Sequence, residues 1–116
     1  PEVRRLLYPA LPGDPGHALW RRDFSGASGL FGVELQPVGK PALTAFFDSL
    51  QLFGIGASWG GYESLIMPAH FRRTASRPGF TGPLIRLHIG LEDPDDLLAD
   101  LVRGFAAMAA AVKAGN

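Results

Sequence analysis

A serine stands between two glycines in the segment GASWG, residues 56–60, at the spacing of the nucleophile elbow of α/β-hydrolases. Such an elbow needs a strand, a sharp turn at the serine and a following helix, and then an acid and a histidine in that chain order. Pro68 leaves little room for the helix after Ser58. Glu63 is too close to Ser58 in sequence to be the acid on a separate loop at the end of another strand. All aspartates after Ser58 lie beyond the last histidine, His88. The order of acids and histidines therefore argues against a serine nucleophile.

The loop around Ser58 has a second chemical possibility, which is anion binding. Glycines at positions 54, 56, 60 and 61 let the backbone approach a neighbour closely. Trp59 stands where the third glycine of a dinucleotide-binding fingerprint belongs, so that motif is disfavoured. A loop with free backbone N–H groups and a hydroxyl can nevertheless bind an anion.

The strand-like segment PLIRLHIGL, residues 83–91, places a cation among apolar residues. Alternation predicts one face with Ile85, Leu87, Ile89 and Leu91, and a second face with Leu84, Arg86, His88 and Gly90. A guanidinium in this setting needs a partner, and its fork matches a carboxylate. That carboxylate could belong to a ligand or to an internal acid such as Glu63, and the pattern leaves both open. We predict that His88 packs or forms hydrogen bonds rather than acting as a catalytic base.

Two helices must hold these segments in place. Pro41 suits the first turn of a helix, and the apolar residues that follow at helical spacing are Leu43, Phe46, Phe47 and Leu50. We expect the last three of these to be buried. Asp93 is a good N-cap for a second helix that ends near Gly115. The predicted apolar stripe of that helix consists of Leu97, Leu98, Leu101, Phe105, Met108 and Val112. Capping and the helix dipole explain the acidic cluster EDPDD, so we predict no metal site.

Short strand-like segments complete the chain. They are Val3–Tyr8, LFGVELQ at 30–36, LFGIGA at 52–57, ESLIM at 63–67 and the segment at 83–91, with a helical turn at 17–22. The order strand, helix, several strands, helix predicts an α+β fold with a small, mainly antiparallel sheet and helices packed on one face.

The overall composition limits the class of partner. The 116 residues fit one domain, and eleven basic against eleven acidic residues leave no net charge. Neither nucleic acid nor a membrane surface is therefore an expected partner. There is no cysteine and no apolar run of membrane-spanning length, so we expect a cytoplasmic protein without disulfides.

Two longer segments, LFGIGASWGGYESLIMP and GPLIRLHIGLEDPDDLLADLVRGF, resemble the pyridoxal-phosphate enzymes of cysteine and methionine metabolism. The similarity extends through PALPGDPGHALWRRDFSGASGLF and covers essentially the whole chain. Within that family, SWGG and RLHIGLED resemble the cystathionine β-lyase branch, because the γ-synthases and γ-lyases typically have leucine at the position of Trp59 and more often serine at that of His88.

The resemblance implies an aminotransferase-like (fold type I) architecture, in which residues 1–116 are the smaller C-terminal domain and the cofactor domain is missing. It implies that Arg86 binds the α-carboxylate of the substrate and that Ser58 and the backbone N–H of Trp59 close on the same carboxylate. The Ser58 hydroxyl would also lie near the amine of the catalytic lysine, which makes it a catalytic residue. Ala57 stands where some β-lyases carry an aromatic residue, so the fit of the distal substrate chain is expected to differ.

The resemblance implies pyridoxal 5'-phosphate as the cofactor of the full-length parent enzyme. That enzyme would be a homo-oligomer that acts in methionine biosynthesis and converts cystathionine to homocysteine, pyruvate and ammonia. Neither Lys40 nor Lys113 has the context of the family's cofactor-binding lysine, so we expect this chain alone to bind no cofactor and to be inactive. Two other interpretations stay open: a domain of a related γ-lyase or γ-synthase, and a stand-alone anion-binding module.

Overall fold

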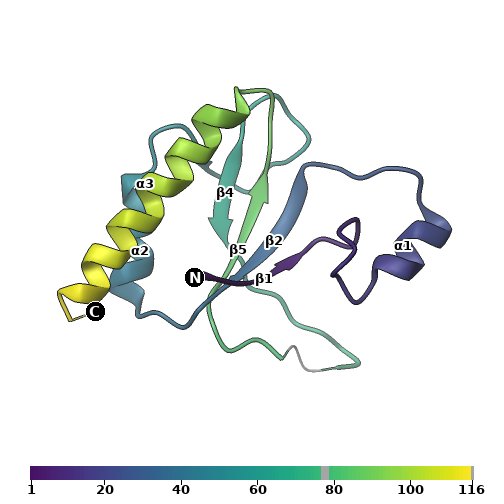
Figure 1. Cartoon of the computed structure of the whole chain (residues 1–116), viewed down its shortest axis with the longest axis horizontal. Coiled ribbons are helices and arrows are strands. Elements are labelled where there is room, and N and C mark those ends of the chain that lie inside the picture. Colours follow the sequence, from purple (N-terminus) through teal and green to yellow (C-terminus); the bar gives the residue numbers. More distant parts are fainter. Residues whose placement is uncertain (77–78, 116) are drawn as a thin grey trace.

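Within the residues that the computed structural model describes, 1–76 and 79–115, five strands form one sheet (Figure 1). The strands are β1 (Val3–Leu7), β2 (Leu30–Leu35), β3 (Gly54–Ile55), β4 (Leu65–Pro68) and β5 (Leu84–His88). Their order across the sheet is β1-β2-β5-β4-β3, and all neighbours are antiparallel except β3 and β4. The prediction of a small, mainly antiparallel sheet is confirmed, and β5 lies at its centre.

Three helices accompany the sheet in the described part of the chain: α1 (His17–Asp23), α2 (Lys40–Ser49) and α3 (Pro94–Lys113). Helices α2 and α3 pack side by side against the sheet, as predicted, and share one apolar core with it (Figure 1). Helix α1 lies at the opposite end of the molecule, and every one of its residues is at least partly exposed. Helix α1 corresponds to the helical turn predicted at 17–22, and the predicted packing of the two longer helices on one face of the sheet is confirmed.

Local signals explain where α2 and α3 begin. Pro41 lies in the first turn of α2, where the missing N–H costs nothing. The Asp93 carboxylate accepts a hydrogen bond from the Asp95 N–H at 2.8 Å and so caps α3. The two helices approach closely at Gly104, where a Cβ atom would lie 2.7 Å from the Phe46 ring. Any larger residue at this crossing would push the helices apart.

The core lies between the helix pair and one face of the sheet. Its buried members include Val33, Leu35, Phe46, Ile66, Ile85, Leu87, Leu97 and Met108. Phe46 is fully buried, whereas Phe47 and Leu50 lie at the edge of the core. Alternation along β5 is confirmed for Ile85 and Leu87.

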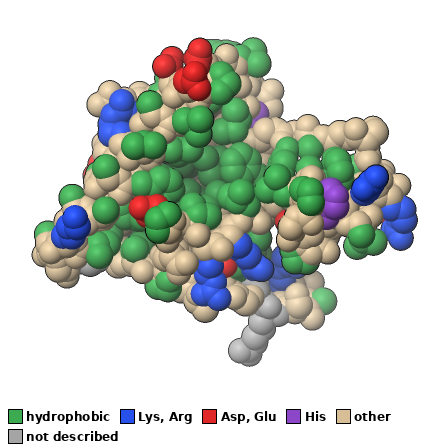
Figure 2. Space-filling model, in the orientation of Figure 1, with side chains coloured by type: hydrophobic (Ala, Val, Ile, Leu, Met, Phe, Trp, Pro, Cys, Tyr) green, Lys and Arg blue, Asp and Glu red, His purple; other side chains and the backbone are tan. Residues whose placement is uncertain are grey.

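Three residues predicted to face the core are exposed. Leu91 is 85% exposed because β5 ends at His88 and the strand alternation ends with it. Leu98 and Val112 are 60% and 46% exposed because α3 turns a different face to the sheet. The buried face of α3 consists of Leu97, Asp100, Gly104 and Met108. Figure 2 shows that hydrophobic side chains also gather on the outer surface between α3 and α1.

Asp100 is a buried charge in this helix face. Its carboxylate accepts the backbone N–H groups of Gln51, Leu52 and Phe53 at 2.8 to 2.9 Å and pairs with Arg103. Burial raises the pKa of Asp100, but the three N–H donors and the guanidinium outweigh it, so the pKa lies below its ordinary value of 3.8. The N–H groups bound in this way are not available to a strand ladder. This explains why β3, which covers only Gly54–Ile55 of the predicted strand at 52–57, does not begin before Gly54.

Glu34 on β2 is a second buried carboxylate. It accepts the N–H groups of Thr81 and Gly82 at 2.9 and 3.3 Å, and lies 3.7 and 3.3 Å from the Nε atoms of Arg4 and Arg5. Burial raises the pKa of Glu34, but the two N–H groups and the two guanidinium groups together lower it by more. The pKa of Glu34 is therefore below its ordinary value of 4.5. Glu34 thereby ties the chain before β5 to the sheet.

Candidate functional site

Arg86 lies in the middle of the sheet, on the face away from the α2 and α3 core. Its register neighbours are Gly32 on β2 and Met67 on β4. Because Gly32 has no side chain, Leu7 of the neighbouring strand β1 packs over it, where a Cβ atom would lie 3.1 Å from Leu7 Cδ1. The guanidinium is half-buried and donates to the carbonyl oxygen of Ala57. Glu63 is exposed and does not pair with Arg86 among the described contacts, so the internal ion pair that the sequence left open is not formed.

A pocket of about 320 Å³ opens beside this guanidinium. Its walls are formed by Leu7, Gly32, Met67, Ala69, His70, Phe71, Leu84, Ile85 and Arg86. A mainly apolar pocket with one fixed cation is suited to a small organic acid, because the cation orients the carboxylate and the walls contact the carbon chain. This pocket is the candidate binding site.

The glycine loop lies next to this site although it is 29 residues away in sequence. Ala57, whose carbonyl Arg86 binds, directly precedes Ser58 and Trp59. Ser58 is exposed and Trp59 is 63% exposed, so both side chains are available at the surface. The structure therefore brings together the loop and the cation that the sequence analysis singled out separately.

His88 holds the far end of the same loop. Its ring is 7% exposed, its Nδ1 atom accepts the Gly60 N–H at 3.3 Å, and its Nε2 atom lies 3.0 Å from the Gly61 carbonyl oxygen. Because Nδ1 accepts, the ring proton belongs on Nε2, which donates to that carbonyl. The prediction that His88 is a hydrogen-bonding residue is confirmed.

The residues that anchor the exit of the loop were not found from the sequence. The Ser64 N–H and hydroxyl donate to the two carboxylate oxygens of Glu92 at 2.9 and 2.7 Å, and the Gly90 N–H donates to the Ser64 hydroxyl at 2.8 Å. The Ser64 N–H and hydroxyl lower the pKa of Glu92, against a smaller effect of burial. Because helix capping accounts for the whole of EDPDD, no separate signal in the sequence marks Glu92.

These carboxylates predict loss of stability in acid. Glu34, Glu92 and Asp100 each have a pKa below the ordinary values of 4.5, 4.5 and 3.8. The unfolded chain therefore binds more protons than the folded chain below those values, so their stabilisation is complete above about pH 6 and is lost as pH falls below about 4.5. We expect a lower denaturation midpoint at pH 4 than at pH 7, measured with urea and tryptophan fluorescence. An equal midpoint at both pH values would contradict this assignment.

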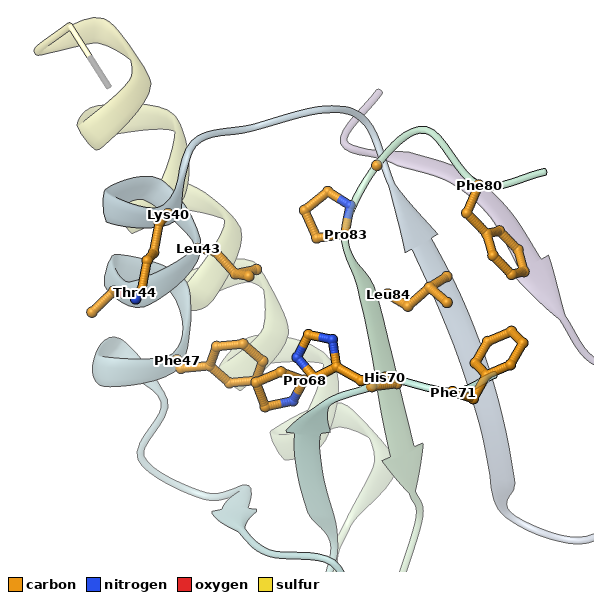
Figure 3. Close-up of a pocket in the computed structure, with 12 residues that line it drawn as sticks. Lys40, Leu43, Thr44, Phe47, Pro68, His70, Phe71, Phe80, Pro83 and Leu84 are labelled. Carbon is orange, nitrogen blue, oxygen red and sulfur yellow. The ribbon is translucent and has the colours of Figure 1, made fainter. Parts of the chain in front are cut away.

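Both lysines of the chain lie away from the Arg86 pocket. Lys40 and Lys113 lie at the start of α2 and the end of α3, and neither lines the pocket that contains Arg86. Lys40 instead lines a larger cavity of about 610 Å³ between α2 and the chain around β4 and β5, together with Phe47, His70 and Leu84 (Figure 3). This cavity is mainly apolar and has no cluster of phosphate-binding groups among the residues drawn.

Among residues 1–76 and 79–115, no group of three or more His, Asp or Glu side chains is placed to hold a metal ion. None of the helices in this part of the chain has the length and apolar composition needed to cross a bilayer.

The overall fold of the chain is similar to that of known structures. Cystathionine γ-synthase from Xanthomonas oryzae pv. oryzae, solved with aminoacrylate and cysteine, superposes with a TM-score of 0.79 at 35% identity, over 94% of this chain and 30% of that one. The fold is thus the α+β class found in fold type I pyridoxal-phosphate enzymes.

Sequence comparison gives the family. Residues 1–106 match the family described as Cys/Met metabolism PLP-dependent enzyme, and the chain belongs to it. Cystathionine beta-lyase MetC of Escherichia coli (strain K12) is 52% identical over 114 residues, covering 91% of this chain and 28% of that protein. Cystathionine gamma-lyase of Mus musculus is 40% identical over 114 residues, covering 92% of this chain and 28% of that protein. The chain therefore spans less than a third of the length of these relatives.

Proposed function

We propose that residues 1–116 form the C-terminal, substrate-binding domain of a pyridoxal-phosphate-dependent cystathionine β-lyase. The observation that carries the proposal is the Arg86 pocket on the open face of the sheet, with the Ser58 loop bound at its edge. The identity to the E. coli β-lyase, 52% against 40% for the mouse γ-lyase, supports the β-lyase branch. Membership of the family supports pyridoxal phosphate as the cofactor of the complete enzyme.

The roles of the site residues follow from their chemistry. Arg86 binds the α-carboxylate of the substrate through its guanidinium fork, which fixes the orientation of the amino acid. Ser58 and the Trp59 N–H close on that carboxylate from the loop side, and the Ser58 hydroxyl faces the catalytic lysine of the cofactor domain. The cofactor, held by that domain, supplies the electron sink for removal of the α-proton and loss of the β-substituent.

The reaction is tested on an assembled enzyme, by which we mean this chain joined to a cofactor domain. The assembled enzyme is either the chain's own full-length protein or a chimaera in which the chain replaces the matching segment of the E. coli relative. With cystathionine as substrate we expect pyruvate, homocysteine and ammonia. The alternative is a γ-lyase or γ-synthase domain, for which the Xanthomonas structure is the supporting observation. A γ-lyase would release 2-oxobutyrate and cysteine, and mass spectrometry of the oxo acid separates the two.

The chain alone should be inactive, because the described residues place no lysine in the Arg86 pocket. We expect that pyridoxal phosphate added to the purified 116-residue chain gives no visible absorbance band of a lysine-bound cofactor beyond that of a lysine-matched control protein. We also expect no release of pyruvate from cystathionine. The assembled enzyme is the positive control for both measurements. A saturable absorbance band on the isolated chain would contradict this prediction and would favour a stand-alone binding module.

A further inference from the structure

Two side chains from one face of β5 hold the glycine loop at both of its ends. Arg86 donates to the Ala57 carbonyl, and His88, two residues further along the strand, binds Gly60 and Gly61. Ser58 and Trp59 lie between these two attachment points and have exposed side chains. The position of their backbone is therefore set by the attachments of the loop rather than by burial of their own side chains.

We propose that His88 is a positioning residue that presets the Ser58–Trp59 backbone for the substrate carboxylate. This inference rests on the proposed function of Arg86 and the loop. His88 itself does not contact the carboxylate. It acts by fixing the loop before the substrate arrives, so that the cost of ordering the loop is not subtracted from binding.

The surroundings of His88 support a fixed rather than an adaptable loop. The ring is nearly fully buried, and its register neighbours are Leu30 on β2 and Leu65 on β4. Gly60 has a φ of +83°, which a residue with a side chain rarely adopts, so the turn at this point depends on glycine. A hydrogen bond to the N–H of Gly60 holds that turn in place.

The continuation of β5 keeps the loop from moving away. The Leu91 N–H donates to the Tyr62 carbonyl at 2.7 Å, and a Cβ atom at Gly90 would lie 2.2 Å from the same carbonyl oxygen. The Glu92 carboxylate fixes Ser64 directly after the loop. The loop is therefore attached at its start by Arg86, at its turn by His88 and at its exit by Glu92.

The loop needs one hydrogen-bond acceptor and one donor from the side chain at position 88, and an imidazole supplies both. It offers an acceptor at Nδ1 and a donor at Nε2 on one rigid ring, and each reaches a different backbone group of the loop. The side-chain oxygen of asparagine can occupy the place of Nδ1, and the side-chain nitrogen of glutamine can reach that of Nε2. Each of these substitutions therefore keeps one of the two hydrogen bonds, whereas alanine removes both.

The test uses the assembled enzyme with His88→Ala, His88→Asn and His88→Gln, and Leu98→Ala as a control at an exposed position on α3. We expect His88→Ala to raise KM for cystathionine roughly tenfold, with a smaller change in kcat, since two hydrogen bonds that organise binding are lost. His88→Asn and His88→Gln should give intermediate KM values. Hydrogen exchange of the peptide covering residues 57–61 should be slow in the unsubstituted enzyme, faster in His88→Ala and unchanged in Leu98→Ala.

Two results would overturn the role of His88: an unchanged KM in a folded His88→Ala enzyme, or fast exchange at the Gly60 amide of the unsubstituted enzyme. The exchange measurement on the unsubstituted enzyme decides the matter if His88→Ala does not fold. Arg86→Leu in the same assay distinguishes failure of the proposed function from failure of the positioning role of His88. If Arg86→Leu has normal kinetics, the proposed function fails; if only the His88 variants do, the positioning role fails alone.

Discussion

Replacing Arg86 by leucine in the assembled enzyme should lower kcat/KM for cystathionine roughly 10²- to 10³-fold. Of the described residues that line the pocket, Arg86 is the one with a permanent positive charge and the others are mainly apolar, so its removal would leave the substrate carboxylate without this charged partner. The same substitution removes the hydrogen bond to the Ala57 carbonyl and frees the start of the loop. We therefore expect KM to rise and kcat to fall together, because both affinity and orientation are lost.

Two further variants sharpen this experiment. Arg86→Lys keeps the positive charge but loses the planar fork, so kcat/KM should recover only in part. Arg21→Leu removes an exposed arginine from α1, outside the site, and should leave both constants within about twofold of the unsubstituted enzyme. Normal steady-state kinetics in a folded Arg86→Leu enzyme would refute the assignment of the carboxylate site.

Replacing Asp100 by alanine should lower the free energy of unfolding by about 2 to 4 kcal/mol, because hydrogen bonds to a charged acceptor contribute about 1.5 to 3 kcal/mol each. The carboxylate is 1% exposed and is the acceptor for three consecutive backbone N–H groups in the chain between α2 and β3. Without it those N–H groups lose their acceptor, Arg103 loses its partner, and a cavity forms beside α3. The melting temperature should fall by roughly 10 °C or more, measured by scanning fluorimetry.

Asp96→Ala is the matched control for this prediction. Asp96 lies one turn earlier on α3 and is exposed, so its loss should cost less than about 1 kcal/mol through the helix dipole. Asp100→Asn should fall between the two, because an amide keeps one acceptor oxygen but loses the charge. If Asp100→Ala melts at the same temperature as Asp96→Ala, the carboxylate does not hold the chain between α2 and β3.

The elements that follow from the sequence are those with local signals. The proline and apolar spacing of α2 and the Asp93 cap of α3 place both helices correctly, because capping and helical periodicity depend on residues within one or two turns. The alternation along β5 correctly predicts buried Ile85 and Leu87. The prediction fails for Leu91, since nothing local marks the end of the strand at His88.

The sequence by itself determined the family of this protein, the α+β class and the choice of Arg86, Ser58 and Trp59 as the residues of interest. Only the tertiary structure decided that Arg86 binds the loop at Ala57 rather than the side chain of Glu63. It also decided that Asp100 is buried as an acceptor for the chain between α2 and β3, that His88 and Glu92 hold the glycine loop, and that Leu98 lies on the surface.

The physical reason is the sequence separation of the partners. The hydrogen bonds that position the site join residues 26 to 29 apart, and those of Asp100 join residues 47 to 49 apart. Such bonds form only after β4 and β5 have paired and α3 has packed against α2, so their donors and acceptors carry no local pattern. The residues next to Asp100 and His88 in the sequence therefore do not indicate which backbone groups these two side chains bind in the folded chain.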